Sequence, residues 1–194
     1  MTRTATLNRT TNETAINGRI DVDGNGISAI DTGLGFLDHM IVTLTKHAGF
    51  DFELNAVGDT VVDDHHTVED CAIVLGRGIG EALGDRTGIR RFGYAYAALD
   101  ESLVRAVVDL SGRPWPEIHI DLAREQIGGV ATENVVHFLR TLAIEGRMAL
   151  HVDLIRGDND HHRAEAAFKA TALALRSAME ITGAETPSTK GTLI

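Results

Sequence analysis

The stretch His65-His66-Thr67-Val68-Glu69 decides the interpretation of this sequence, because its pattern returns later as His161-His162-Arg163-Ala164-Glu165. Each copy places two adjacent histidines before a glutamate. One further histidine precedes each copy: His65 follows His39 by 26 residues, and His161 follows His137 by 24 residues. A repeat that keeps polar residues of the same type indicates a repeated ligand set, whereas a repeat of hydrophobic residues alone could be structural.

Similar elements surround the two copies, which predicts an internal duplication. In the first half we expect strands near residues 4–16, 19–22, 27–30 and 50–57, and helices at 35–47 and 65–83, the second capped by Asp63-Asp64. In the second half we expect strands at 94–99, 103–110 and 148–155, and helices at 132–145 and 161–181, the last capped by Asp160. The order predicts an α+β fold with antiparallel sheet. It forms a single domain, 1–194, built from two similar halves of about 1–95 and 96–194.

Helix geometry limits which of the repeated side chains can share one metal ion. Residues i and i+4 lie on the same face of a helix, so His65 and Glu69 can hold one ion, and the same holds in the second copy. The adjacent histidine, His66, is rotated by about 100° and points elsewhere. If a pseudo-twofold axis relates the halves, each leftover histidine can complete the site of the other half. Spacing alone does not decide which site His39 or His137 joins.

The residue types narrow the metal but do not fix it. Three imidazoles and one carboxylate exclude a structural zinc site of the cysteine type and suit Mn, Fe, Co, Ni or Zn. Carboxylate ligands and an octahedral site with two open positions favour Mn(II). The alternative is that these histidines only hydrogen-bond loops at helix starts. His119 and His151 lie outside the pattern and are expected to be ordinary strand residues, whereas spacing alone makes His47 a helix-end cap.

Composition excludes several functional classes. The net charge of −10 argues against nucleic acid as the main ligand, although a local pocket for a small phosphate remains compatible. Cys71 is the only cysteine, which fits a reducing cytoplasm, and the polar first residues do not resemble a signal peptide. No apolar run is long enough for a membrane span. Gly76, Gly78 and Gly80 lack the flanking residues of a phosphate loop, so we expect them to serve helix packing.

Six ordered motifs carry a family resemblance that runs from about Arg9 to Leu193. They are Gly35-Phe36-Leu37-Asp38-His39-Met40, Asp64-His65-His66-Thr67-Val68-Glu69-Asp70, Asp100-Glu101, Asp109-Leu110-Ser111-Gly112-Arg113-Pro114, Asn159-Asp160-His161-His162 with Glu165 and Phe168-Lys169-Ala170, and Pro187-Ser188-Thr189-Lys190-Gly191. Together they resemble the imidazoleglycerol-phosphate dehydratases of histidine biosynthesis.

The resemblance implies a fold, a cofactor and an assembly. The fold is a duplicated four-stranded sheet with paired helices, similar to the second domain of ribosomal protein S5. The cofactor is two Mn(II) ions per active site, and the assembly is a homo-oligomer of 24 subunits with sites between chains. The resemblance assigns His39, His66, His161 and Glu165 to one metal site. It assigns His65, Glu69, His137 and His162 to the other.

The resemblance also assigns roles in the reaction. Glu13 resembles the catalytic acid/base. The residues that resemble substrate contacts are Glu13, His39, His47, His65, Glu69, Arg91, Arg113, His161, Lys169, Ser188, Thr189 and Lys190. The reaction would convert D-erythro-imidazole glycerol phosphate to imidazole acetol phosphate through an imidazolate bound by two manganese ions.

The chemistry of this reaction makes the implied metal pair reasonable. The proton to be lost sits on a carbinol carbon and is not acidic, and hydroxide is a poor leaving group. Two cations on the ring nitrogens would lower the pKa of the ring N–H and help expel the hydroxyl group, after which Glu13 would act as general base. The alternatives are a dinuclear metallohydrolase and a metal-storage shell. An assay with imidazole glycerol phosphate, with and without Mn(II), separates the three.

Overall fold

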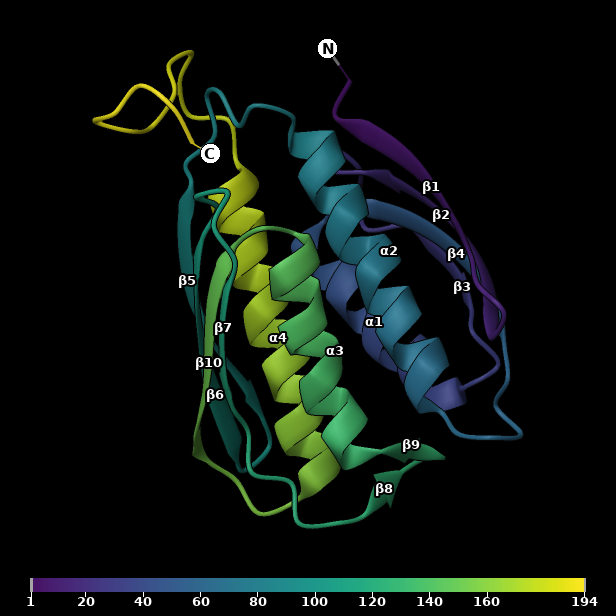
Figure 1. Ribbon diagram of the computed structural model, residues 1–194. Coiled ribbons are helices and arrows are strands. Elements are labelled where there is room, and N and C mark those ends of the chain that lie inside the picture. The colour runs from purple at the N-terminus through teal and green to yellow at the C-terminus, as the bar shows by residue number, and fades with distance from the viewer. Residues whose placement is uncertain (1, 194) are drawn as a thin grey trace.

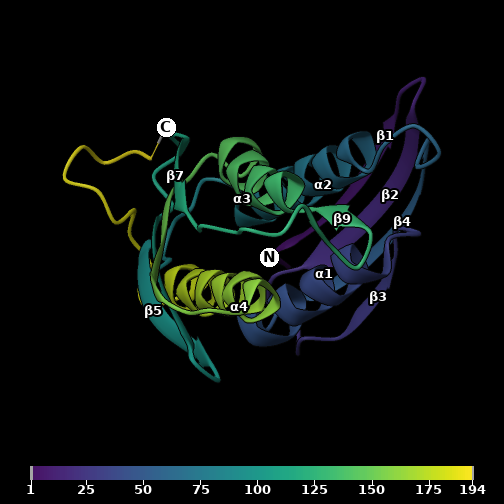
Figure 2. The ribbon, with the colours of Figure 1, turned by 90° about the horizontal axis from the view of Figure 1, so that it is seen from below.

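The computed structural model describes residues 2–193, in which two four-stranded sheets enclose two pairs of helices (Figure 1). Figure 2 shows the order of layers: one sheet, α3 with α4, α1 with α2, and the other sheet. The α+β duplication expected from the sequence is confirmed. No helix in this described range is long and apolar enough to cross a membrane.

The elements follow the same order in each half, apart from a short extra hairpin in the second. The first half contains β1 (Thr4–Thr10), β2 (Thr14–Asp21), β3 (Ser28–Asp31), α1 (Gly35–Ala48), β4 (Asp51–Gly58) and α2 (His65–Leu83). The second contains β5 (Phe92–Leu99), β6 (Ser102–Asp109), β7 (Trp115–His119), β8 (Gln126–Ile127), β9 (Val130–Ala131), α3 (Thr132–Glu145), β10 (Ala149–Arg156) and α4 (Asp160–Met179).

The sheets are mixed, which corrects the expectation of purely antiparallel pairing. Their strand orders are β1-β2-β4-β3 and β5-β6-β10-β7, and in each the last pair is parallel. The reason is the connection between those strands. Helix α1 joins β3 to β4, and α3 joins β7 to β10, and a helical crossover returns the chain to the end from which it started. Each half is therefore a hairpin, a strand–helix–strand unit and a closing helix.

The apolar residues of the helices build the core between the sheets. The predicted stripe on α1, which includes Met40, Ile41 and Leu44, is buried. Across the middle of the molecule, α1 packs on α4 and α2 packs on α3. A side chain at Gly76 would place its Cβ 2.9 Å from the carbonyl oxygen of Leu142 on α3. Gly76 therefore allows close approach of the two helices, which confirms the packing interpretation of the glycines in α2.

The start of α4 differs from the prediction. Asn159, not Asp160, is the N-cap: its side chain accepts hydrogen bonds from the backbone N–H groups of His161 at 2.9 Å and His162 at 3.4 Å. Asp160 is the first helical residue, and its carboxylate accepts from the backbone of Ala123 and Arg124. The helix ends at Met179, before the predicted residue 181. The extended backbone of Asn159 suits a cap, whereas a residue already inside the helix cannot act as one.

At α2 only part of the predicted cap is present. Asp63 accepts from the backbone N–H of His65 at 2.9 Å, whereas the Asp64 carboxylate accepts from Ala131 N and makes no cap hydrogen bond. Two strand predictions also change. Residues 4–16 form parts of two strands separated by a turn at Thr11, and residues 19–22, expected as a separate strand, largely belong to the end of β2. The residue patterns did not predict β7, β8 or β9. These missed strands have five residues or fewer, too few to show a clear alternation.

Candidate metal centre

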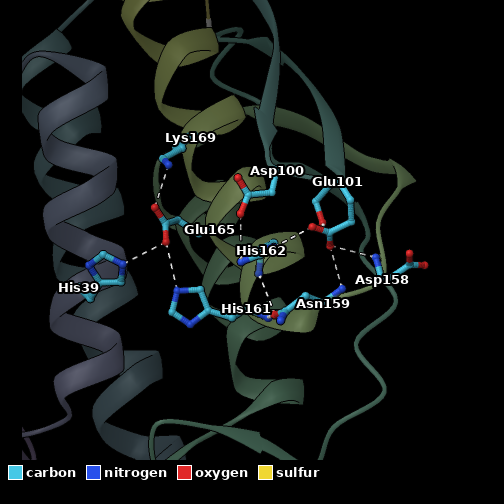
Figure 3. A network of polar contacts seen from close by, with 10 residues as sticks. His39, Asp100, Glu101, Asp158, Asn159, His161, His162, Glu165 and Lys169 are labelled. Carbon is cyan, nitrogen blue, oxygen red and sulfur yellow. Dashed lines mark hydrogen bonds and ion pairs between the residues drawn. The ribbon is translucent and has the colours of Figure 1, made fainter.

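One group of metal-ligating side chains, the His39 cluster, consists of His39, His161 and Glu165. The Nε2 atoms of His39 and His161 each lie 3.1 Å from Glu165 Oε2, and the three ligand atoms are all within 4.8 Å of one another. Figure 3 shows the glutamate between the two imidazoles, which come from α1 and α4. Lys169, one turn further along α4, contacts the other carboxylate oxygen at 2.8 Å.

The charge of Glu165 is stabilised by its neighbours. Partial burial opposes ionisation, but hydrogen bonds from Lys169 and His39 outweigh it and lower the pKa of Glu165 to about 2. The carboxylate is therefore ionised at neutral pH, as a metal ligand must be. Lys169 also lies close enough to His47 on α1 to affect it: burial, followed by the charge of Lys169, lowers the pKa of His47. Two predicted substrate contacts thus adjoin this cluster.

A second group, the His137 cluster, consists of His65, Glu69 and His137. His137 Nε2 lies 2.9 Å from Glu69 Oε1, and the rings of His65 and His137 stack with centroids 4.9 Å apart. Its three ligand atoms also lie within 4.8 Å of one another. The side-chain oxygen of Asn134 lies 2.9 Å from His65 Nδ1, which leaves Nε2 of His65 facing the cluster.

Each cluster combines residues from both halves of the chain. In the His39 cluster, α1 of the first half supplies one histidine and α4 of the second half supplies the other two ligands. In the His137 cluster, α3 supplies the single histidine and α2 the others. This exchange follows from the packing of α1 on α4 and of α2 on α3. Each of the two clusters is therefore built from one helix of each half, and both contain two histidines and one glutamate.

The two remaining histidines of the predicted ligand sets, His66 and His162, lie outside both clusters. Asp59 contacts His66 Nδ1 at 3.1 Å, and Glu101 contacts His162 Nδ1 at 2.8 Å. Because a carboxylate occupies Nδ1, each ring presents Nε2 as its free ligand atom. A hydrogen bond from each ring to its carboxylate raises the pKa of both histidines. In a single chain, each cluster thus has three of the four ligands that the family resemblance implies.

Asp59, Glu101 and Asn134 were not among the site residues predicted from the sequence. The Glu101 carboxylate also accepts from the backbone N–H groups of Asp158 and Asn159, and these bonds, with the one from His162, hold the pKa of Glu101 well below its usual range. Glu101 belongs to a quoted motif, so a signal existed for it. Nothing in the spacing of Asp59 or Asn134 indicates an orienting role.

Glu13 lies at the tip of the β1–β2 hairpin, beside His66, one of the two predicted ligands outside the clusters. Its carboxylate is 3.7 Å from His66 Nε2, and its side chain is 52% exposed. The same arrangement recurs in the second half, where Asp100 at the tip of the β5–β6 hairpin lies 3.7 Å from His162 Nε2. The structure thus brings Glu13 next to a predicted ligand but leaves its carboxylate open to solvent.

Among the predicted substrate contacts, Arg91 and the tail residues Ser188, Thr189 and Lys190 lie at the opposite end of the molecule from the clusters (Figure 1). Arg91 donates its backbone N–H to Ala178 O near the end of α4, about 25 Å along this helix from His161. The tail with Ser188, Thr189 and Lys190 follows that same helix end and extends away from it (Figure 1). One chain therefore does not unite the clusters with these four predicted substrate contacts.

Arg91 is largely engaged by other groups. Its Nε and Nη2 donate to the two oxygens of Asp109 at 2.7 and 3.1 Å, and its Nη1 donates to Pro187 O at 2.9 Å. Arg91 thereby ties the start of β5 and the end of β6 to the C-terminal tail. Arg113 is exposed, and Lys190 donates its backbone N–H to Ser188 Oγ at 3.2 Å. Arg91 therefore holds the base of the projecting C-terminal tail.

The duplicated fold, with two His/Glu clusters that each combine residues of both halves, defines an α+β protein with two related candidate metal sites. Residues 32–175 match the sequence profile of the family described as imidazoleglycerol-phosphate dehydratase. The chain belongs to this family, whose members are hydro-lyases of histidine biosynthesis.

Individual relatives agree with this assignment over almost the full chain. The imidazoleglycerol-phosphate dehydratase of Candida glabrata is 48% identical over 97% of this chain and 99% of its own length. The relative from Phytophthora nicotianae is 51% identical over 98% of this chain, which spans 42% of that longer protein. The crystal structure of the Staphylococcus aureus dehydratase matches with a TM-score of 0.84 and 40% identity, covering 92% of this chain and 99% of that one.

Proposed function

We propose that this chain dehydrates D-erythro-imidazole glycerol phosphate to imidazole acetol phosphate with two Mn(II) ions. The observation that supports this most strongly is the pair of matched clusters, each with two imidazole nitrogens and one carboxylate oxygen within 4.8 Å. An imidazole ring also has two nitrogens, so two equivalent cation sites suit a substrate that carries this ring. Family membership supports the same substrate.

The side chains of the clusters fit divalent metal ions. Imidazole and carboxylate donors suit Mn, Fe, Co, Ni and Zn, and the carboxylates favour Mn(II) among them. Asn134 orients His65, and Lys169 together with His39 keeps Glu165 ionised. When bound, two divalent cations lower the pKa of the imidazole N–H and favour departure of the hydroxyl group on the adjacent carbon.

The remaining steps fall to groups of the protein itself. In this proposal Glu13 accepts the proton from the neighbouring carbon as general base, and its exposed carboxylate leaves room for a substrate. Arg91, Arg113, Ser188, Thr189 and Lys190 bind or organise the phosphate end, while His47 and Lys169 contact the substrate beside the His39 cluster. Anchoring the phosphate restricts the reacting carbons to one geometry, which lowers the entropic part of the barrier.

We further propose that the active site forms between chains in a 24-subunit particle. His66 of a neighbouring chain would complete the His39 cluster, and His162 of a neighbour would complete the His137 cluster. Two observations support this. The Nδ1 atoms of both histidines are engaged, so that Nε2 is available. The phosphate contacts also lie about 25 Å along α4 from His161, farther than a small substrate reaches within one chain.

A turnover assay tests the proposed reaction. Metal-stripped protein is mixed with imidazole glycerol phosphate and assayed before and after addition of Mn(II). We expect imidazole acetol phosphate only in the presence of the metal. Release of inorganic phosphate would indicate a metallohydrolase instead. Metal uptake without any turnover would indicate a storage shell.

Sedimentation tests the proposed assembly. A metal that bridges chains stabilises the oligomer by linkage, because it binds the assembled state more tightly than the separate subunits. Chelation at neutral pH is therefore expected to convert the large particle to smaller species, with trimers expected, and Mn(II) to restore it. A sedimentation coefficient that chelation leaves unchanged contradicts bridging by metal.

A further inference from the structure

The position of the Glu13 carboxylate depends on the backbone of the hairpin tip, because its exposed side chain has little packing of its own. Thr11 Oγ accepts hydrogen bonds from the N–H groups of Glu13 at 3.1 Å and Thr14 at 3.0 Å. The carbonyl oxygen of Glu13 accepts from Asp59 N at 3.1 Å. Both backbone polar groups of Glu13 are thus held, and the turn closes on Thr14.

Thr14 connects this turn to helix α2. Its side chain is buried, and its hydroxyl donates to Oδ2 of Asp70, a residue that is 4% exposed. The other oxygen of Asp70 lies 2.8 Å from Nε of Arg9 on β1. A buried carboxylate is costly unless charged and hydrogen-bonding partners compensate for its lost hydration. Both of these partners come from the hairpin, so the carboxylate fastens the hairpin to the helix that carries His65 and Glu69.

The second half of the duplication lacks this buried connection. Asp70 directly follows the cluster residue Glu69, whereas Ala166 directly follows Glu165. The residue that begins β6, as Thr14 begins β2, is Ser102, and its hydroxyl donates to the neighbouring Glu101 at 3.0 Å. The same hairpin and helix therefore pack in the second half without a buried carboxylate that joins them, since the buried carboxylate of α4, Asp160, bonds to the backbone of Ala123 and Arg124 instead. The fold does not require the connection, which is present only in the half that carries Glu13.

We propose that Asp70 and Thr14 are positioning residues for the dehydration: the Asp70 carboxylate, through the Thr14 hydroxyl, fixes the hairpin tip so that Glu13 stays beside His66. This inference rests on the proposed role of Glu13 as general base. A base must stay within hydrogen-bonding reach of the proton that it removes. A misplacement of about 1 Å can lower the rate about 100-fold.

The substitution Thr14→Val tests the connection, because it keeps the shape of the side chain and removes the hydroxyl. It is cleaner than a change at Asp70, which adjoins Glu69. We expect kcat to fall about 10- to 100-fold while KM and metal content stay unchanged. Hydrogen exchange in the peptide that contains the hairpin tip should become faster. Thr14→Ser, which restores a hydroxyl, should recover most of kcat.

The matched control is Thr171→Val on α4. Thr171 is fully buried, and its hydroxyl has no hydrogen-bond partner among the described residues, so kcat should not change. The decisive comparison is made in a Glu13→Gln background. There Thr14→Val should have no further effect on the residual rate, because the group that it positions is already lost.

Each other outcome has a defined meaning. An equal fall of kcat in the wild-type and Glu13→Gln backgrounds would show a general structural role and overturn the proposal. Unchanged kcat in Thr14→Val, with Glu13→Gln inactive, would overturn the positioning role and leave the proposed function intact. Full activity of Glu13→Gln would instead refute the role of Glu13 itself, and the positioning role with it.

Discussion

The two halves of the chain repeat their ligand clusters but surround them differently. Four residues after Glu165, Lys169 contacts its carboxylate and, together with His39, lowers the pKa of Glu165 to about 2 against the opposing effect of burial. Four residues after Glu69 stands Ile73, which offers no charge. The buried pair of Thr14 and Asp70 occurs only in the first half. The two halves therefore share the His/Glu clusters, whereas the residues around these clusters differ.

The outer faces of the two sheets differ even more. On the first sheet, Asn8, Asn17 and Asn55 stand side by side in register on an exposed polar face. On the second, Tyr94 is 76% and Trp115 62% exposed. Both sheets nevertheless have the same strand order. The fold is therefore set by the inward-facing residues that pack on the helices, and the outer faces are free to diverge.

The largest expected effect tests whether the two clusters are equivalent. We expect His65→Ala and His161→Ala to lower kcat/KM by at least about 100-fold each, because each would remove a ligand from one of the two proposed cations. Turnover and bound metal are measured together. His119→Ala, an exposed strand histidine outside both clusters, is the control and should behave like the wild type. Loss of activity in only one cluster variant would break the equivalence of the halves.

A smaller effect tests how closely each hairpin packs on its helix. A Cβ at Gly93 would lie 1.9 Å from the backbone oxygen of Ala174, whereas a Cβ at Gly18 would meet the Val74 Cγ1 methyl at 2.5 Å. The Val74 side chain can shift to make room, whereas the backbone of α4 at Ala174 cannot. We expect Gly93→Ala to reduce the free energy of unfolding by about 3 kcal/mol and Gly18→Ala by about 1 kcal/mol, measured by urea denaturation of metal-free protein. Equal reductions of the free energy of unfolding in the two variants would show that both hairpin–helix interfaces accommodate a methyl group equally well.

The smallest expected effect concerns the C-terminal tail, which only the second half carries. Asp109→Asn weakens the pairing that aligns Arg91 with Pro187 O, so we expect KM to rise about tenfold with kcat nearly unchanged, as for one lost charge-assisted hydrogen bond. Steady-state kinetics measure this. Asp153→Asn is the matched control, because Asp153 pairs with Arg105 on the outer sheet face. A similar change in the control would indicate a general effect of charge.

Much of the fold followed from residue patterns. The predicted bounds of α2 and α3 agree with the structure, because each begins at a polar stretch and repeats apolar residues at helical spacing. The parallel edge strands did not follow, since periodicity reveals a strand but not its direction or partner. The cap at Asn159 was misassigned to Asp160, because two adjacent residues both have side chains that can cap a helix.

The sequence by itself determined the duplication and the candidate ligand types, because the His-His-x-x-Glu pattern recurs and helix geometry fixes which of its residues share a face. Spacing left open which cluster His39 and His137 join; the family resemblance assigned them, and the tertiary structure places His39 beside His161 and His137 beside His65. It also decided that Asp59 and Glu101 orient the remaining histidines and that Asp70 reaches Thr14. Such contacts join residues far apart in the chain. They arise from how helices and hairpins pack together, which local spacing does not specify.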